Sequence, residues 1–235
     1  MDGMDTRTKA LIGEEGIGSL KDTFVVLAGV GAVGGYALEG LVRSGIRHIR
    51  VIDGDVFNET NLNRQILATM ESIGRRKVDV AIERARSINS DVDIEGVFSL
   101  ITEDRLDDLL KGGPDIIVDA IDTVEHKVAL LRYASQHGFT VFSSMGAALH
   151  IDTQSIRVAP LKKTKVCPLA SAVRSRLRDV DTSRITAVYS EEPPLVIPNE
   201  RDDHGKSVLG SLPTVPAIFG MTLANEVIRY VISRP

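Results

Sequence analysis

The sequence predicts an α/β protein with a doubly wound, mostly parallel sheet. Over the first 150 residues, short apolar runs rich in β-branched residues alternate with amphipathic segments of helical period, which is the pattern of βαβ units. A glycine-rich turn joins the first apolar run to the first amphipathic segment. The chain has 235 residues, 43% hydrophobic and 26% charged, so it is long enough to cover such a sheet on both faces.

The apolar runs are short and bounded by glycine or polar residues, as expected for buried parallel strands. The expected strands are 24–28, 48–53, 92–98, 115–122 and 139–144. In the segments between them apolar residues recur every three or four positions, as Val78, Ile82 and Ala85 do, which predicts amphipathic helices. The expected helices are 32–44, 77–89, 103–111 and 124–137.

The pattern changes after residue 150. The runs 155–160 and 186–190 are expected strands without an amphipathic helix of the earlier kind between them, which predicts an antiparallel extension of the sheet. Pro168 favours the start of a short helix that ends near Arg178. Residues 214–232 are apolar at helical spacing, and we expect them to pack back on the sheet.

Neither an internal repeat nor a linker divides the sequence. We therefore expect one domain over 1–235, made of an N-terminal helical segment (1–22), a nucleotide-binding core (23–150) and a substrate-side extension (151–235). Residues 191–211 are polar and rich in proline, which indicates a mobile loop within the extension.

Composition excludes several classes of protein. A single cysteine, Cys167, excludes an internal disulfide framework and a four-thiolate zinc site. The formal net charge of −4 gives no global argument for nucleic-acid binding. No apolar run approaches the roughly 20 residues of a membrane span, and the N-terminus lacks the apolar region of a signal peptide. We therefore expect a cytoplasmic protein with no membrane partner.

The glycine-rich turn GVGAVG predicts a phosphate site. Gly29, Gly31 and Gly34 lie between a strand and a helix, where glycines permit a tight turn and the helix N-terminus offers free N–H groups to phosphate. Asp53 ends the second strand, where an acid would accept hydrogen bonds from ribose hydroxyls. NAD and ATP fit these residues equally well.

The polar stretch DVFNETNLNRQ (55–65) favours ATP. It supplies Arg64 and Gln65, GRRK adds Lys77, and DAIDT adds Asp119 and Asp122. In a doubly wound sheet the carboxyl ends of these strands converge on one crevice. Phosphate-binding cations together with a hard oxygen ligand for Mg²⁺ suit attack on a phosphorus atom, where developing charge needs fixed positive partners.

Five motifs in this order (GVGAVG, VIDGD, NLNRQ, GRRKVD and DAIDT) resemble those of the E1-like activating-enzyme superfamily. That group includes the adenylating enzymes of thiamine and molybdopterin synthesis, and the resemblance covers about residues 7–150. It implies a Rossmann-like adenylation fold with ATP and Mg²⁺ as cofactors. The cofactor-binding residues that it implies are Gly29, Gly31, Ala32, Gly34, Asp53, Asp55, Asn61, Arg64, Gln65, Lys77 and Asp122.

The resemblance also implies a role for each group. Asp53 would hold the ribose, Asn61 and the catalytic cations Arg64 and Lys77 the phosphates, and Asp122 the metal. The stretch DTRTKALIGEEG resembles the superfamily's N-terminal helix, whose arginine reaches across a homodimer into the neighbouring site. Arg7 is the best match. A partner-supplied arginine would neutralise charge as it develops on phosphate.

The acceptor is the point on which the branches of the superfamily differ. Members that activate ubiquitin-like or sulfur-carrier proteins commonly carry two CxxC pairs, which one cysteine cannot provide. The stretches CPLASAVRSRLR, AVYSEEPP and GSLPTVPAIFGMTLANEVIRYVI are similar instead to the tRNA threonylcarbamoyladenosine dehydratases. This resemblance implies adenylation of the t6A37 carboxylate of tRNA and cyclisation to cyclic t6A. Adenylation of a carrier protein's C-terminus stays open as the alternative, followed by a binding-only scaffold and an NAD oxidoreductase.

A tRNA partner requires a basic surface. Seven cations crowd one part of the extension: Lys162, Lys163, Lys165, Arg174, Arg176, Arg178 and Arg184. Such a cluster is either a phosphate-binding surface or a solvated face. The thiol of Cys167, before a helix start, is either reactive or a packing residue. The resemblance leaves a sulfur-transfer protein open as a further partner.

Overall fold

The computed structural model describes residues 3–197, 200–201 and 208–234. Seven strands form a single sheet in the order β3-β2-β1-β4-β5-β7-β6. Their bounds are β1 Phe24–Ala28, β2 His48–Asp53, β3 Asp93–Phe98, β4 Ile116–Asp119, β5 Thr140–Ser144, β6 Ile156–Pro160 and β7 Ile185–Ser190. Every adjacent pair is parallel except β6 and β7. The predicted doubly wound sheet with an antiparallel extension is confirmed.

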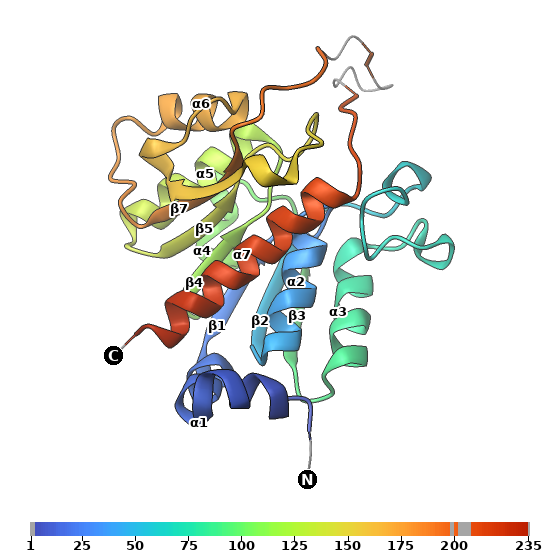
Figure 1. The fold of residues 1–235 in the computed structure, drawn as a ribbon, viewed down its shortest axis with the longest axis vertical. Helices are drawn as coiled ribbons and strands as arrows, with labels where there is room; N and C mark the ends of the chain where they lie inside the picture. Colours follow the sequence, from blue (N-terminus) through green and yellow to red (C-terminus); the bar gives the residue numbers. More distant parts are fainter. Residues whose placement is uncertain (1–2, 198–199, 202–207, 235) are drawn as a thin grey trace.

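Helices cover both faces of the sheet (Figure 1). Their bounds are α1 Thr6–Asp22, α2 Gly34–Ser44, α3 Lys77–Ile88, α4 Leu106–Leu109, α5 Val124–Gln136, α6 Pro168–Arg176 and α7 Thr214–Ile232. Helices α2, α3 and α7 share one hydrophobic cluster with the sheet, and α4, α5 and α6 share the other. Alternate residues of β1 divide between the clusters, since Val25 and Leu27 belong to the first and Val26 and Ala28 to the second.

Two expected elements end earlier than predicted. Strand β4 stops at Asp119 rather than at residue 122, because the Asp119 side chain turns back to accept the N–H of Ile121 at 3.1 Å. The helix expected over 103–111 is a 3-10 turn followed by the four-residue α4. The loop expected over 191–211 falls partly outside the described residues, which omit 198–199 and 202–207.

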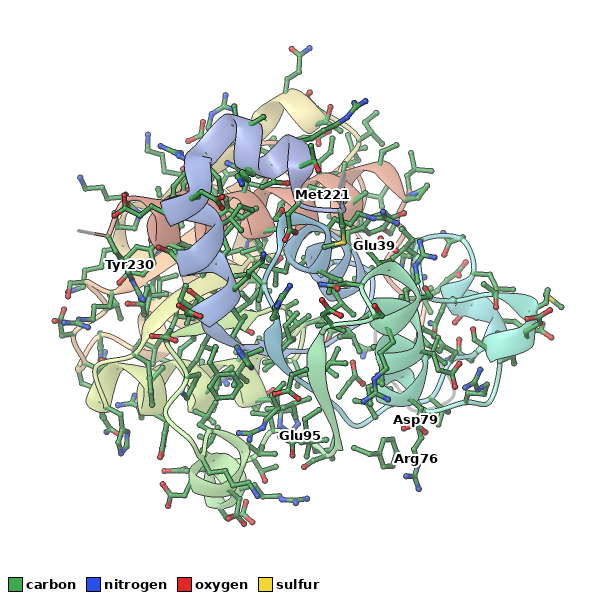
Figure 2. The ribbon with its side chains drawn as sticks, turned by 90° about the horizontal axis from the view of Figure 1, so that it is seen from below. Glu39, Arg76, Asp79, Glu95, Met221 and Tyr230 are labelled. Atoms are coloured by element: carbon green, nitrogen blue, oxygen red, sulfur yellow. The ribbon has the colours of Figure 1, made fainter. Side chains whose placement is uncertain are left out.

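Helix α7 crosses α2 at close range because glycines remove side chains from the contact. A β-carbon at Gly40 would lie 2.6 Å from that of Ala224, and one at Gly220 would overlap the carbonyl oxygen of Val33. Figure 2 shows Met221 of α7 beside Glu39 of α2 at this crossing. Among the described residues, α7 is the one helix long and apolar enough to span a membrane. The sequence analysis, which expected no apolar run of that length, overlooked it.

We predict that Gly220→Val lowers the free energy of unfolding by about 1–3 kcal/mol, because the added side chain must separate α7 from α2. Urea unfolding followed by circular dichroism measures the change. The matched control is Gly18→Ala in α1, where a β-carbon meets no atom within 4 Å, and which is expected to be neutral or slightly stabilising. Equal stability of the Gly220 variant and the wild type would contradict the packing argument.

Candidate active site

The glycine-rich turn lies at the carboxyl edge of the sheet, between β1 and α2. Gly29 has φ +88°, a conformation that favours glycine, and its N–H donates to the carbonyl oxygen of Ile52 at 2.8 Å. A β-carbon at Gly34 would overlap the carbonyl oxygen of Gly29, so the turn closes only with glycine there. The N–H groups of Gly31 and Ala32 have no acceptor in the described part of the chain, which leaves them free for an anion.

Asp53 forms a hydrogen bond to the backbone of this turn. Its carboxylate accepts the N–H of Val30 at 2.8 Å through Oδ2 and that of Asp55 at 2.9 Å through Oδ1. Burial raises the pKa of the Asp53 carboxyl, and the nearby ammonium of Lys77 partly offsets that rise. Each oxygen keeps a lone pair for a further hydrogen bond. Asp53 therefore fixes the glycine turn, a role that its place in the sequence did not reveal.

Lys77 begins α3 and is held in place by Asp55. Its Nζ donates to Oδ2 of Asp55 at 2.9 Å, and its N–H to the carbonyl oxygen of the same residue at 3.0 Å. The lysine side chain is only 7% exposed, whereas that of Asp55 is 66% exposed. Asp55 therefore acts on the site through Lys77, whose side chain it holds in place.

The segment between β2 and α3 is rich in amide side chains, which make hydrogen bonds within it and to a neighbouring segment. Asn61 is buried in a short 3-10 turn and accepts the N–H of Asn58 at 3.2 Å. Arg64 is half-buried, and its guanidinium donates to the carbonyl oxygen of Thr60 at 2.7 Å and to the side chain of Asn63 at 2.9 Å. Asn63 in turn donates to the carbonyl oxygen of Ser211 at 3.0 Å. These amides fix a loop that has no regular ladder of its own.

Gln65 provides a test of whether a nucleotide fits. The residue is only 7% exposed, and its Oε1 has no hydrogen-bond partner among the described residues. The empty position of a β-carbon at Gly31 lies 3.8 Å from its side-chain amide. A buried acceptor without a donor is costly unless a ligand supplies one. The unpaired oxygen, the free N–H groups of the turn and the cations together fit ATP.

Asp122 lies in the loop that follows β4. It is exposed, and its Oδ1 accepts the hydroxyl of Thr123 at 3.3 Å. In the described part of the chain no group of three or more His, Cys, Asp and Glu side chains is placed to hold a metal. One carboxylate is consistent with Mg²⁺, which usually takes one or two carboxylates and completes its shell with phosphate oxygens and water.

The structure separates Arg7 from these residues. Asp5, two residues before Arg7, shares a cleft with Arg47, Asn89 and Asp91, which precede β2 and β3. Helix α1 therefore lies at the amino edge of the sheet, opposite the glycine turn (Figure 1). Arg7 is exposed, with no described partner.

The basic cluster of the extension is divided in two. Three of its members are engaged: Arg174 donates to Thr164, Arg176 to Glu125, and Arg184 to the carbonyl oxygen of Gly138. Four are exposed, and in the described part of the chain their side chains make no hydrogen bond or salt bridge, namely Lys162, Lys163, Lys165 and Arg178. These four are therefore the part of the cluster able to bind phosphate.

Two functionally informative side chains remain. Cys167 is 1% exposed and packs beside Gly146, which agrees with a packing role. Lys127 is fully buried and paired with Asp119, and the sequence analysis did not single it out. The signal was present, since Lys127 stands at helical spacing with Leu130, Leu131 and Ala134 on the core face of α5.

Comparisons with known proteins show which enzymes this chain resembles. The tRNA threonylcarbamoyladenosine dehydratase of Bacillus subtilis (strain 168) is 31% identical over 234 residues, 95% of this chain and 92% of that protein. The crystal structure of E. coli tRNA N6-threonylcarbamoyladenosine dehydratase in complex with ATP matches with a TM-score of 0.88 at 31% identity, covering 97% of this chain and 93% of that one. The sulfur carrier protein ThiS adenylyltransferase of B. subtilis is 36% identical, but over 55% of this chain and 39% of its own length.

The resemblance drawn from the motifs is confirmed by these comparisons, as is the E1-like adenylation fold. The profile of the ThiF family matches residues 5–235, almost the whole chain. The chain therefore belongs to the ThiF family.

Proposed function

We propose that the chain is an ATP-dependent dehydratase that adenylates the t6A37 carboxylate of tRNA and promotes its cyclisation to cyclic t6A. One observation carries the choice of acceptor. The similarity to the tRNA-modifying relative extends over 95% of the chain, whereas the similarity to the carrier-activating relative covers 55%. The extension that follows the nucleotide core is thus shared with dehydratases, and the single cysteine agrees with it.

The reaction has two steps. A carboxylate oxygen of the threonylcarbamoyl group attacks the α-phosphorus of ATP, and pyrophosphate leaves. A nitrogen of the same group then attacks the carbonyl carbon of the mixed anhydride, AMP leaves, and the nitrogen loses its proton. The tRNA loses one water in total. Because the nucleophile of the second step is internal, its rate comes from proximity, and the protein needs no covalent group.

The residues of this chain would position ATP and neutralise the charge of its phosphates. The N–H groups of the glycine turn and the side chains of Asn61, Arg64 and Lys77 would hold the phosphates, and Asp53 the ribose. Asp122 would hold Mg²⁺, which neutralises phosphate charge when bound. Fixed cations around a leaving pyrophosphate lower the barrier, because they need no reorganisation as charge develops.

We propose a homodimer in which Arg7 of one protomer completes the site of the other. The support is its location: α1 lies at the opposite edge of the sheet from the glycine turn, so Arg7 cannot serve the site of its own chain. A cytoplasmic location is part of the same proposal, since the substrate is a tRNA. A sulfur-transfer protein as a partner stays a prediction.

The three exposed lysines of the extension should set the affinity for tRNA. We predict that the triple variant Lys162→Glu, Lys163→Glu, Lys165→Glu raises the KM for tRNA at least tenfold and lowers the slope of log KM against log salt by about 2–3, with an unchanged KM for ATP. The charge-matched control replaces Arg86, Arg105 and Lys111 by glutamate, three exposed residues outside the basic cluster. Equal effects of the two triple variants would contradict a local tRNA surface.

Cys167 should be dispensable. We predict that Cys167→Ala leaves cyclisation within about twofold of the wild type, because the buried thiol packs against its neighbours and an internal nucleophile needs no thioester. Single-turnover rates of AMP release measure the effect. Complete loss of turnover in a variant that still binds ATP would restore the thioester route.

Acceptor-dependent pyrophosphate release separates the alternatives. The enzyme is incubated with ATP and either tRNA carrying t6A37 or a carrier protein ending in Gly-Gly. Release with the tRNA alone supports the dehydratase, and release with the carrier alone would replace it by the carrier-activating alternative. Release with neither would favour a binding-only scaffold.

A further inference from the structure

A buried lysine and a buried aspartate form an ion pair between α5 and the end of β4. Lys127 of α5 and Asp119 at the end of β4 have no exposed surface, and Nζ lies 2.6 Å from Oδ2. The ammonium group also donates to the carbonyl oxygen of Ser144 at 2.9 Å and lies 3.4 Å from the hydroxyl of Ser143. That hydroxyl donates to Oδ2 of Asp119 at 2.6 Å. Each hydrogen of the ammonium therefore has an acceptor.

Stability alone does not account for this pair. Taking two charges out of water costs several kcal/mol each, and apolar side chains of similar volume often serve a core equally well or better. The neighbours of Lys127 on the same face of α5 are apolar and buried, as Leu130 and Leu131 are. A lysine on such a face is therefore a candidate for a task other than packing.

The pair joins β4 to the first turn of α5, the two elements on either side of the loop that carries Asp122. That loop is formed by residues 120–123. The second carboxylate oxygen of Asp119 accepts the N–H of Ile121 at 3.1 Å, one residue before Asp122. The carbonyl oxygen of Ala120 lies 3.0 Å from the position that a β-carbon at Gly29 would take. Asp119 thus contacts the backbone next to Asp122, and Ala120 between them lies against the glycine turn.

We propose that Lys127 and Asp119 are positioning residues that hold the loop 120–123 in the conformation in which Asp122 binds Mg²⁺ together with ATP. The inference rests on the proposed function, because it takes Asp122 as the metal ligand. Neither residue of the pair is proposed to touch the nucleotide. They act through the backbone of Ile121 and the start of α5.

The test uses the double variant Asp119→Asn, Lys127→Met, which removes both charges but keeps the volume and the acceptor for Ile121. The first readout is amide hydrogen exchange of residues 120–123 in the nucleotide-free protein. The second is the Kd of ATP by calorimetry, with and without Mg²⁺. The matched control is Arg50→Met, Glu95→Gln, which removes an ion pair between β2 and β3 with a 2.8 Å contact; Figure 2 labels Glu95 on β3.

We expect the double variant to fold, to exchange the amides of 120–123 faster than the wild type, and to bind ATP with Mg²⁺ roughly tenfold more weakly. Its Kd for ATP without Mg²⁺ should change less than about twofold, and the control should match the wild type. Unchanged exchange in 120–123, or equal losses with and without Mg²⁺, would overturn the inference. If the double variant does not fold, Ser143→Ala, which removes one hydrogen bond to Asp119, takes its place. It should show smaller increases in the exchange of 120–123 and in the Kd of ATP with Mg²⁺. If it shows neither, the inference is overturned.

Asp122→Asn distinguishes this inference from the proposed function. If that variant binds ATP with and without Mg²⁺ as the wild type does, the metal role of Asp122 fails, and the inference fails with it. The hydrogen-exchange result would then describe a structural clamp only. If Asp122→Asn loses the Mg²⁺-dependent part of the affinity and the double variant does not, the proposed function stands and the inference alone is wrong.

Discussion

Arg64→Ala should lower the rate of adenylation by about 10²–10³-fold, the usual cost of removing one fixed donor from developing charge. The fold should survive, because Arg64 is only half-buried and its described hydrogen bonds are local, to Thr60 and Asn63. Single-turnover release of pyrophosphate with t6A-containing tRNA measures the rate. The thermal midpoint, read on the same samples, measures the fold.

The comparison needs an arginine whose loss changes charge but not the site. Arg86 on α3 is exposed with no described side-chain partner, so Arg86→Ala is expected to react at the wild-type rate. A near-normal rate for Arg64→Ala would contradict the proposed role of its guanidinium in binding the phosphates. A common loss in both variants would indicate an effect of net charge.

Mixing two inactive variants should restore activity if Arg7 acts across a dimer. Arg7→Ala and Arg64→Ala are each expected to be nearly inactive as homodimers, since a partner-supplied arginine contributes about 10³-fold or more to related phosphate chemistry. In a mixed dimer, the protomer that keeps Arg64 receives Arg7 from its neighbour, so one of its two sites is complete. After subunit exchange at equal amounts, about a quarter of the wild-type activity should return, because half of the dimers are mixed.

The control for this experiment is a mixture of Arg64→Ala with the double variant Arg7→Ala, Arg64→Ala, in which no site can be complete. Restored activity there would point to reversion or contamination. No recovery in the first mixture, with subunit exchange verified by mass spectrometry, would contradict a role in trans. Full activity of Arg7→Ala alone would remove Arg7 from the site.

The sheet could be predicted because burial on both faces makes parallel strands apolar throughout. FVVLA, for example, became β1 with its last four residues buried. The end of β4 could not be predicted, because IIVDAID reads as one run, and only the hydrogen bond of Asp119 to Ile121 ends the strand.

Which candidate residues lie together could be predicted where their type and their place after a strand suggested it. Glycines before a helix and cations after a strand have few other uses in this order, and the structure brings Asp53, Lys77 and the glycine turn to one edge. Contacts between distant segments had no such signal. That Asp53 supports the turn through Val30, and that Lys127 reaches Asp119, depends on which side chains face each other across the fold.

The central claim is that the crevice at the carboxyl edge of the sheet activates the t6A carboxylate by transferring AMP to it. The most direct measurement is nucleoside mass spectrometry of t6A-containing tRNA after incubation with the enzyme and ATP. The account predicts conversion of t6A to a product lighter by one water, with one AMP formed per product, and conversion by Arg64→Ala slower by about 10²–10³-fold. Unchanged t6A under conditions in which the enzyme instead adenylates a carrier protein's Gly-Gly terminus would contradict it.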